Sequence, residues 1–471
     1  MQRQSHNILR LSRIKLKAFY DEDNGYALPS ILFLITILSV VVLSILALQY
    51  FQRQNVQIAA AKVKADYAAQ SGISKIFADL KSKSDLPLIG QAIERSYELS
   101  DGEKASVTIE WWGSYLHVRS IGSFRRVNET RFALAGQTPT ERFKNVLVFA
   151  NKSHQLVLTG LTHIKGDVIV GPPGVSIGTL SNYPTPRIMP IEGNVKRDPK
   201  IDIQDFELAK QYDYYNALLG GTIPQGNEQG SIQHLQSESQ LHISSGMIKP
   251  ETKFVFERGN AIIDSALIRR EIPLNIIIDG EVTFGADVHI DGLVCIVSSQ
   301  SMRIQHAAHI GGAILYSRKE ITVEPAAILT AQIIAPAIQI EGGAKMLYPS
   351  TLISYLKKDN NDPRKGIQIK NGAQVEGTVI VNADDNTQNT VLLNIESGAK
   401  ISGFVVANTP ITLDGSVDGC VQTKDFYFYQ SPTTYLGWLR SARMNREALP
   451  KSALMTVGID SLSQLQVLDW L

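Results

Sequence analysis

The sequence predicts a mainly β protein with a long N-terminal transmembrane α-helix, a small antiparallel sheet and then a right-handed parallel β-helix. Three observations favour this fold class. The stretch from Tyr26 to Gln49 contains no charged side chain, and residues 104–136 hold short runs in which apolar and polar residues alternate. A motif of fixed register then recurs through most of the remaining chain.

The apolar stretch reads YALPSILFLITILSVVVLSILALQ. At about 1.5 Å per helical residue it can cross a hydrocarbon core of roughly 30 Å. Only Arg53 follows it closely, whereas five basic residues precede it: Arg3, Arg10, Arg13, Lys15 and Lys17. This asymmetry predicts a single-pass anchor in the inner (cytoplasmic) membrane and the lipid bilayer as a partner, with the N-terminus inside and the bulk periplasmic or extracellular. A cleaved signal peptide fits poorly, because the run exceeds a typical apolar signal region and no small-x-small pair follows it closely.

The junction before the span is more specific. Residues 21–25 read DEDNG, and the apolar run begins at once with Tyr26. This junction resembles the leader of type IV prepilins and pseudopilins, and the nearest subgroup is the PilX-type minor pilins. The resemblance implies cleavage between Gly25 and Tyr26 by a prepilin peptidase, and other pilin-like subunits as partners. Ser30 departs from the family, since most major pilins have Glu there, which puts self-polymerisation in doubt. A plain uncleaved signal anchor is the alternative.

Helical spacing continues beyond the span. Residues 52–83 contain no proline and only one glycine, Gly72, and apolar residues recur three and four positions apart. The resulting apolar stripe needs a partner, either the protein's own sheet or another subunit. Three strands should follow, Ala105–Trp111, Tyr115–Ile121 and Val127–Leu134, with glycine turns between them. They resemble the small sheet that pilins pack against their helix.

The rest of the chain repeats one pattern: an apolar residue, a small residue four positions on, an apolar residue two further and often Gly two after that. Clear copies are Phe284-Val288-Ile290-Gly292, Ile304-Ala308-Ile310-Gly312, Val323-Ala327-Leu329-Ala331, Ile340-Ala344-Met346-Tyr348, Ile369-Ala373-Val375-Gly377 and Ile395-Ala399-Ile401-Gly403, with an early copy at Leu158-Thr162-Ile164-Gly166. The first steps between copies are 20, 19 and 17 residues, and the next two are 29 and 26.

A period of about 20 residues with short strands and Gly corners is typical of a parallel β-helix. No helical pattern intervenes, which argues against βαβ units. Similar rungs occur in bactofilins and in exported proteins of the pectate-lyase type, so this resemblance implies a fold and no particular activity.

Composition limits the function classes. Charged residues make up 19% of the chain and its formal net charge is +1, which gives no electrostatic case for nucleic acid. Two cysteines occur, Cys295 and Cys420. They fall about six rungs apart, far beyond disulfide reach, and we expect both to be buried.

Several polar residues are candidates for a metal site or a catalytic site. His289 and His309 occupy one register position on neighbouring rungs and are weak metal candidates, because zinc needs a third or fourth ligand. His163 shares their register but should lie several rungs away, and His306 lies on a turn. A carbohydrate-active enzyme would need clustered carboxylates, and Asp279, Asp287 and Asp291 near Arg303 instead look like solvated rung edges. The group Asp384-Asp385-Asn386 lacks calcium-loop spacing. We therefore expect no catalytic residue, no cofactor and no enzyme.

Three polar stretches interrupt the repeat, at 180–235, 356–365 and 382–390, and the first should contain a helix from Phe206 to Leu219. The tyrosines of that helix are expected to pack it on the rod. An aromatic cluster should cap the last rung, since an open edge would pair with other chains: Phe426, Tyr427, Phe428, Tyr429, Tyr435 and Trp438. A glycan-stacking platform is the alternative for this cluster. A short helix is expected in residues 436–450.

The predicted organisation is a prepilin-like leader (1–25), a transmembrane and stalk helix (26–83), a small sheet (84–137), first β-helix rungs (138–179), an insertion with a helix (180–235), the main β-helix (236–430) and a C-terminal cap and tail (431–471). The expected function is structural: a minor-pilin-like component of a type IV pilus or type II secretion-like system that displays a rod for adhesion, with a surface glycan as a further candidate partner. The alternatives are a polysaccharide lyase or hydrolase, and a bactofilin-like scaffold.

Overall fold

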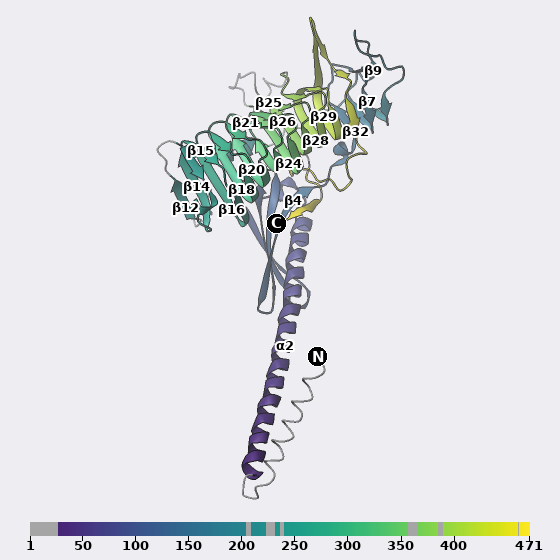
Figure 1. Ribbon diagram of the computed structural model, residues 1–471. Coiled ribbons are helices and arrows are strands. Elements are labelled where there is room, and N and C mark those ends of the chain that lie inside the picture. Colours follow the sequence, from purple (N-terminus) through teal and green to yellow (C-terminus); the bar gives the residue numbers. More distant parts are fainter. Residues whose placement is uncertain are drawn as a thin grey trace, which may run out of the picture. The chain divides into compact units, whose positions relative to one another are not determined.

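The structure is a computed structural model, and it describes residues 27–203, 209–222, 231–235, 240–356, 366–384, 390–459 and 461–471. The chain divides into two compact units, Met1–Lys64 and Ala65–Leu471. It is mainly β, with one long apolar helix near the N-terminus, a small antiparallel sheet and a large parallel sheet (Figure 1). The predicted fold class is confirmed.

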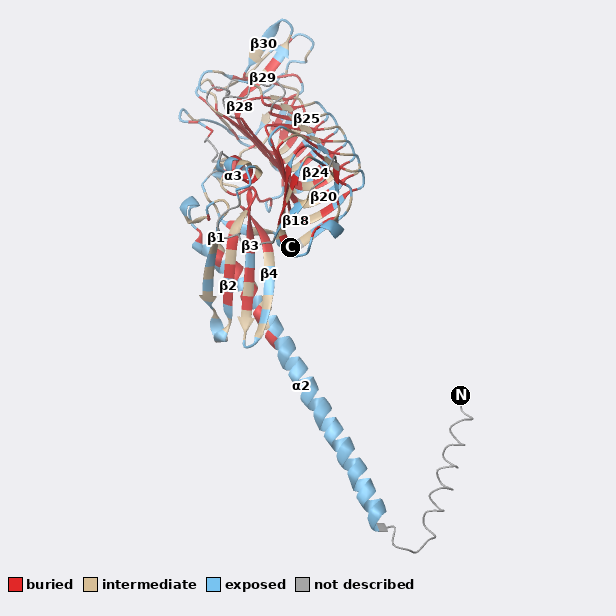
Figure 2. Cartoon of the chain, turned by 90° about the vertical axis from the view of Figure 1, so that its left-hand side faces the viewer, coloured by how far each residue is buried: buried red, intermediate tan, exposed pale blue. Residues whose placement is uncertain are grey.

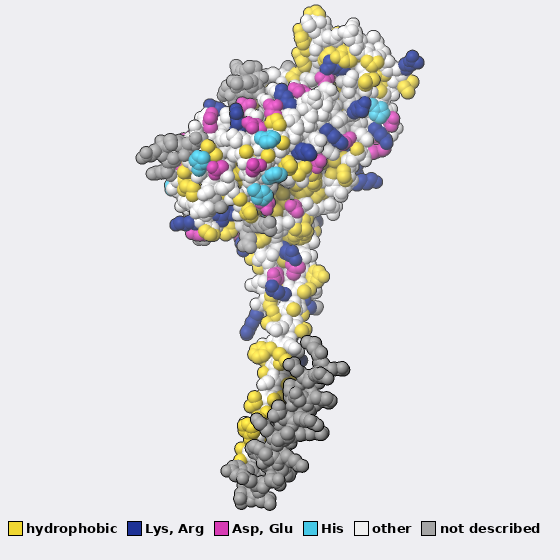
Figure 3. All heavy atoms as spheres, in the orientation of Figure 1, with side chains coloured by type: hydrophobic (Ala, Val, Ile, Leu, Met, Phe, Trp, Pro, Cys, Tyr) yellow, Lys and Arg dark blue, Asp and Glu magenta, His cyan; other side chains and the backbone are white. Residues whose placement is uncertain are grey.

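Helix α2, Ala27–Asp79, begins in the first unit and ends in the second. Its large apolar side chains from Leu28 to Phe51 are all exposed, as the pale blue ribbon in Figure 2 shows. Figure 3 shows yellow side chains along the part of this helix that is in view. Within the described residues it is the one helix long and apolar enough to cross a membrane. The predicted continuous helix is confirmed, although it ends at Asp79 and not at residue 83.

The antiparallel sheet has the order β1-β2-β3-β4-β33. Its strands are β1 Ala92–Glu98, β2 Lys104–Trp112, β3 Tyr115–Phe124, β4 Val127–Gln137 and β33 Leu465–Trp470. The three predicted strands correspond to β2, β3 and β4. The C-terminal residues, expected to be a packed or trailing tail, pair with β4 as an additional edge strand.

One face of this sheet buries the last turns of α2. Ile73 and Ile76 of the helix share a core with Val107 and Val118 of the sheet. The two layers approach closely at Gly122, where a Cβ atom would lie 1.9 Å from the carbonyl oxygen of Ala65. The helical stripe from residue 65 onward is therefore covered by the protein's own sheet, which was one of the two predicted partners.

An ion pair ties the same part of α2 to strand β4. The Arg131 guanidinium donates hydrogen bonds to both carboxylate oxygens of Asp66, and these bonds hold the pKa of Asp66 below its ordinary value of 3.8. A carboxyl group whose pKa is lower in the folded chain than in the unfolded chain stabilises the fold at pH values above its ordinary pKa. This stabilisation is lost as the pH falls through the lowered pKa.

We therefore expect Asp66→Asn to destabilise the second unit at pH 7 by about 0.2–1 kcal/mol, the range of exposed ion pairs. The melting temperatures of variant and parent should converge as the pH falls through the lowered pKa of Asp66 and separate again above its ordinary value of 3.8. Lys104→Gln is the control: it removes a pair with Glu98 whose side chains are 65% and 85% exposed, so it should change the melting temperature little at any pH. A difference between Asp66→Asn and parent that persists unchanged below the lowered pKa would show that the ion pair is not its cause.

The solenoid is built from short parallel strands, most turns contributing three segments. Its strands are β5 Leu147–Phe149, β6 Leu156–Thr159, β7 His163–Lys165, β8 Val168–Val170, β9 Val175–Ile177, β10 Ile191–Glu192, β11 Val195–Arg197, β12 Ser231–Leu235, β13 Gln240–Ile243, β14 Thr252–Arg258, β15 Asn260–Ile263, β16 Leu267–Asp279, β17 Val282–Phe284, β18 His289–Ser298, β19 Met302–Ile304, β20 His309–Ser317, β21 Glu320–Val323, β22 Ile328–Ile334, β23 Ala337–Ile340, β24 Lys345–Leu356, β25 Gly366–Ile369, β26 Gln374–Ala383, β27 Leu393–Ile395, β28 Lys400–Leu413, β29 Ser416–Gln430, β31 Trp438–Arg440 and β32 Arg443–Asn445. Strand β30, Thr433–Leu436, pairs antiparallel with β29.

The predicted register is confirmed by the strand pairing. The second apolar position of the motif forms one inward column that runs Ile290, Ile310, Leu329, Met346, Val375, Ile401, Val417, Met444 and Ile164. These side chains belong to the main hydrophobic core inside the solenoid. Alternation places every second side chain in that core.

The turns of the solenoid do not stack in chain order. The last turn, formed by β29, β31 and β32, pairs in parallel with β5, β6 and β7, which come from residues 147–165. Strands β8 and β10 then pair with β5 and β7, and β11 pairs with β8. The first turns in the sequence thus follow the last turn in space, and we call this joint the seam. Strands β10 and β11, from the stretch predicted as an insertion, complete these turns.

The seam changes two expectations about the C-terminal region. The edge of the last turn is paired by β5, β6 and β7 and is not hidden by an aromatic cap, so that prediction is wrong. The short helix expected in residues 436–450 is wrong as well, because β31 and β32 occupy this stretch. The backbone N–H and C=O groups of β31 and β32 form hydrogen bonds with β6 and β7. In a helix, the same groups would have formed hydrogen bonds with one another.

One side of the solenoid is covered on its outside, which creates a second core. Helix α3, Ala209–Leu219, lies along this side. It falls within the helix predicted for Phe206–Leu219, of which residues 206–208 lie outside the described residues. The hairpin tip between β2 and β3 lies there too. Figure 2 shows the red, buried strands of the solenoid beneath α3. We call this the covered side.

A buried glutamine on the covered side, Gln332, holds the hairpin tip. Its Oε1 accepts hydrogen bonds from the backbone N–H and the hydroxyl of Ser114, at 2.6 and 2.8 Å, and its Nε2 donates to the carbonyl of Trp112 at 2.9 Å. Gln211 of α3 donates to the carbonyl of Gly113 at 3.0 Å. Sheet, helix and solenoid therefore meet in one polar contact, in which both polar atoms of the Gln332 side chain have partners.

Candidate functional site

The predicted processing residues, Gly25 and Tyr26, lie outside the described residues. Helix α2 is described from Ala27, and Ser30 lies exposed in its first turns. Pro29 also lies in the first turn, where its missing N–H costs no helical hydrogen bond.

The histidine candidates lie where the register predicted. His289 pairs directly with His309, and both are exposed. The column continues through Ile328, Lys345, Gln374, Lys400, Ser416 and Arg443 to His163. His306 contacts the carbonyl oxygen of Pro325. No group of three or more His, Cys, Asp or Glu side chains suited to a metal ion occurs within the described residues.

The carboxylate candidates are not brought together around Arg303. The carboxylate of Asp279 accepts a hydrogen bond from the Ser299 hydroxyl at 2.7 Å, at the end of β16. Asp287 and Asp291 flank His289 around a different corner. Arg303 instead faces Glu324 at 3.7 Å. Of the calcium candidates, Asp385 and Asn386 lie outside the described residues, and Asp384 accepts from the Tyr355 hydroxyl.

Both cysteines lie in one column of the covered side, six positions apart, as the register predicted. The positions between them are Ile314, Gln332, Thr351, Thr378 and Phe404. Both thiols are free and buried. Burial raises the pKa of Cys420 to about 12 and raises that of Cys295 as well, so neither is a thiolate near neutral pH.

The C-terminal aromatic residues divide between interior and surface. Phe426 stacks on Phe149 across the seam, with ring centroids 5.7 Å apart and an interplanar angle of 5°. Phe428 stacks on Tyr435 of the β29–β30 hairpin, and the Arg440 guanidinium lies over the Phe428 ring at 4.2 Å. Tyr429 is exposed. Three of the six rings, those of Phe428, Tyr435 and Trp438, therefore pack on one another.

The tyrosines of α3 pack on the covered side, as predicted. The ring of Tyr212 lies 5.6 Å from that of Tyr316 and 5.0 Å from that of Tyr355, and its hydroxyl accepts a hydrogen bond from the Tyr355 N–H. Tyr215 stacks on Tyr316 at 4.9 Å. Burial raises the pKa of Tyr212 and of Tyr215 well above the ordinary value of 10.

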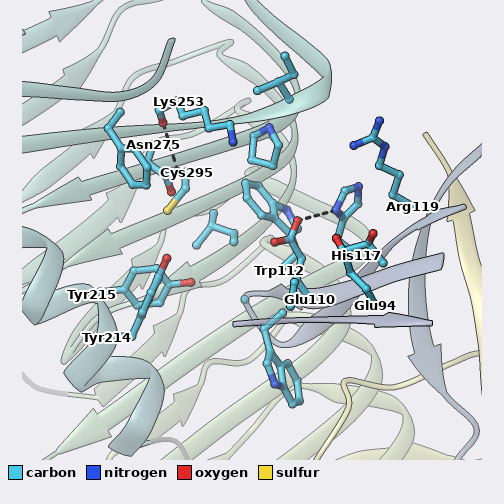
Figure 4. A pocket seen from close by; sticks show the side chains of 18 residues that line it. Glu94, Glu110, Trp112, His117, Arg119, Tyr214, Tyr215, Lys253, Asn275 and Cys295 are labelled. Atoms are coloured by element: carbon cyan, nitrogen blue, oxygen red, sulfur yellow. Dashed lines mark hydrogen bonds and ion pairs between the residues drawn. The ribbon is translucent and has the colours of Figure 1, made fainter. Parts of the chain in front are cut away.

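A cavity of about 330 Å³ lies between the outward face of the antiparallel sheet, helix α3 and the covered side of the solenoid (Figure 4). The sheet contributes charged and aromatic side chains: Glu94, Glu110, Trp111, Trp112, His117 and Arg119. Helix α3 contributes Tyr214 and Tyr215. The solenoid contributes Lys253, Asn275 and Cys295, among others. Residues far apart in sequence thus form one amphipathic cavity.

Several polar groups of the cavity already have partners. The Nδ1 atom of His117 lies 3.1 Å from Oε1 of Glu110. The indole N–H groups of Trp111 and Trp112 donate to the carbonyls of Pro87 and Gly312. Asn275 donates through Nδ2 to the carbonyl of Lys253 at 3.3 Å.

Sequence reasoning missed this cavity. Glu110 and Arg119 lie next to buried residues along β2 and β3, and Glu94 is exposed between half-buried neighbours on β1. This pattern also describes a solvated sheet face. One signal could have suggested a cover: the solenoid strands carry near-continuous apolar runs, such as Leu293–Val297, at the same place in successive turns. Such runs are typical of strands that are buried on both faces.

Comparisons with known proteins yield no family. No family model matches the chain, and no curated protein matches it. Among solved structures, an ice binding protein from an Antarctic bacterium, Flavobacteriaceae, shares 10% identity at a TM-score of 0.19, over 66% of this chain and 98% of that chain. The competence-associated pilin ComZ from Thermus thermophilus shares 10% identity at a TM-score of 0.19, over 87% of this chain and 97% of that chain. Likenesses this distant carry no argument about function.

Proposed function

We propose that the protein is a structural, membrane-anchored and exported component of a pilin-like assembly. In this role it is minor-pilin-like, belongs to a type IV pilus or a type II secretion-like system, and displays its solenoid for adhesion to a surface such as a glycan. It is not an enzyme in this proposal. Its N-terminus lies in the cytoplasm and the solenoid lies outside the inner membrane.

One observation carries the proposal. Helix α2 changes its surroundings along its length: its apolar side chains are uncovered from Leu28 to Phe51, whereas Ile73 and Ile76 are buried against the antiparallel sheet. An uncovered apolar helix of this length is unfavourable in water, because roughly 25 cal/mol is lost for each Å² of exposed apolar surface. A bilayer, or the helices of neighbouring subunits within it, would remove that cost.

The sequence before this helix supports the pilin-like assignment. The junction of Gly25 and Tyr26 separates a polar leader from the apolar run. Ser30 replaces the Glu that most major pilins carry, which fits a minor component better than the main subunit of a fibre.

We expect the mature chain to begin at Tyr26 in cells that contain a prepilin peptidase. Intact-mass spectrometry of the protein purified from the membrane fraction measures this directly. A Gly25→Leu variant should retain the leader, and Gly246→Leu, which replaces a glycine with open space around its Cβ position, should be processed normally. A parent chain that still begins at Met1 in such cells would contradict the pilin-like assignment, although a chain recovered only with detergent would still be membrane-anchored.

A further inference from the structure

The cavity between the antiparallel sheet, α3 and the covered side contains hydroxyl groups that no described residue satisfies. Tyr214 and Tyr215 both point their hydroxyls into it (Figure 4), and no hydrogen bond within the described residues involves either hydroxyl. The Tyr215 side chain is 3% exposed. Tyr215 is buried and Tyr214 is half-buried. Hydroxyls that have no partner and face one cavity point to a ligand or to ordered water.

The other polar groups of the cavity offer both kinds of hydrogen bond. Glu94 and Glu110 provide carboxylate acceptors, and Arg119 and Lys253 provide cationic donors. Asn275 donates its Nδ2 to a backbone carbonyl, and its Oδ1 can accept. Because the two carboxylates are matched by two cations, the cavity has no net charge that would select an anion or a cation.

The apolar part of the cavity includes several aromatic faces beside aliphatic side chains such as Ile272 and Ile314. The indole N–H groups of Trp111 and Trp112 are taken up by backbone carbonyls, so these side chains present only their rings. The pKa values of Tyr214 and Tyr215 are raised by burial, so both phenols are neutral near pH 7 and can donate as well as accept. A ligand that fits must be rich in hydroxyl groups, carry flat apolar faces and have no charge.

We propose that this cavity binds one or two rings of a neutral saccharide. A cavity of about 330 Å³ falls at the small end of ligand pockets, which span roughly 300–1,000 Å³ and combine aromatic walls with a few placed polar groups. The Tyr214 and Tyr215 hydroxyls bond the sugar hydroxyls at the floor, and the Trp faces lie against the ring. The inference rests on the cavity alone and holds whether or not the leader is processed.

The test uses the full chain in a detergent without a sugar headgroup, because an alkyl glycoside would itself compete for the site. Neutral disaccharides (cellobiose, maltose and N,N′-diacetylchitobiose) are titrated while tryptophan fluorescence and saturation-transfer NMR are recorded. At least one of them should bind, and removal of one Tyr hydroxyl by Tyr215→Phe should weaken its binding about 3- to 10-fold. Tyr214→Phe combined with Tyr215→Phe should weaken binding further.

Matched variants separate a site from a general effect. Tyr435→Phe alters a tyrosine of the β29–β30 hairpin, outside the cavity, and should leave binding unchanged. Since the Tyr214 and Tyr215 hydroxyls make no hydrogen bond within the described structure, their removal should not lower the melting temperature. The proposal is overturned if no neutral disaccharide binds, if only charged sugars such as glucosamine or glucuronate bind, or if binding survives both Tyr→Phe changes. Processing at Gly25 is unaffected by any of these outcomes.

Discussion

Replacing Phe426 by alanine is expected to destabilise the solenoid by about 3–5 kcal/mol, the usual cost of removing a buried aromatic side chain. Phe426 is 1% exposed and stacks on Phe149 from the other side of the seam. The two residues should therefore be coupled: a double-mutant cycle with Phe149→Ala should return about 0.5–1.5 kcal/mol of interaction energy. Urea unfolding of the detergent-solubilised chain, followed by tryptophan fluorescence, measures all three variants.

A cross-link tests the seam without destabilising the core. His163 of β7 and Arg443 of β32 are exposed and directly opposite each other. Adjacent strands lie about 4.8 Å apart, within the Cα separation that a disulfide allows. Cysteines at both positions should form a disulfide on mild oxidation. Cysteines at His163 and Lys345, which lie in the same column but five strands apart, should not. If cysteines at His163 and Arg443 formed no disulfide, the seam would be contradicted, because turns stacked in chain order would place these two positions far apart.

The seam itself could not be read from the sequence. The motif copy that contains Ile164 has the same spacing as the later copies, and parallel strand pairing uses backbone groups that are alike in every turn. Periodicity therefore fixes which residues point inward and leaves open which turn lies next to which. Specific contacts choose the neighbour, as where Asp425 accepts hydrogen bonds from Asn151 and His154 at 3.0 and 2.6 Å.

The inward register was readable because two independent signals agree. Alternation of apolar and polar residues defines a face, and the small residue at Ala308, Ala327, Ala344, Ala373 and Ala399 marks the corner before it. All five are fully or almost fully buried. By contrast, the stretch 436–450 has helical spacing over a few residues. Strand pairing with the edges of β6 and β7 outweighs that local helical preference.

The cavity was hidden for a related reason. Trp111 and Glu110 look like ordinary members of a sheet until the solenoid and α3 are placed over them. A polar residue that faces a ligand cavity and one that faces solvent obey the same alternation. The helix at 209–219 was predictable, and so was the packing of its tyrosines. That the hydroxyls of Tyr214 and Tyr215 lack hydrogen-bond partners follows only from their three-dimensional surroundings.

A column of glycines at one corner of the solenoid should be intolerant of any side chain. Gly377, Gly403 and Gly419 are in register, with φ values of 136°, 151° and 152°. A Cβ atom on Gly403 would lie 1.8 Å from the carbonyl oxygen of Gly377, and one on Gly419 would lie 1.8 Å from that of Gly403. Each of these glycines therefore lies so close to the backbone of the preceding turn that no Cβ atom fits.

We expect Gly403→Ala to cost about 2–6 kcal/mol, because a strained φ and an overpacked contact contribute about 1–3 kcal/mol each. Gly259→Ala separates the two contributions: Gly259 has a φ of 123° but open space around its Cβ position, so only about 1–3 kcal/mol should be lost. Gly246→Ala, with neither feature, should change stability by about 0.5 kcal/mol or less. Urea midpoints of the three variants rank the effects. Equal losses for Gly403→Ala and Gly259→Ala would mean that backbone conformation alone, and not the close stacking of the turns, requires glycine at this corner.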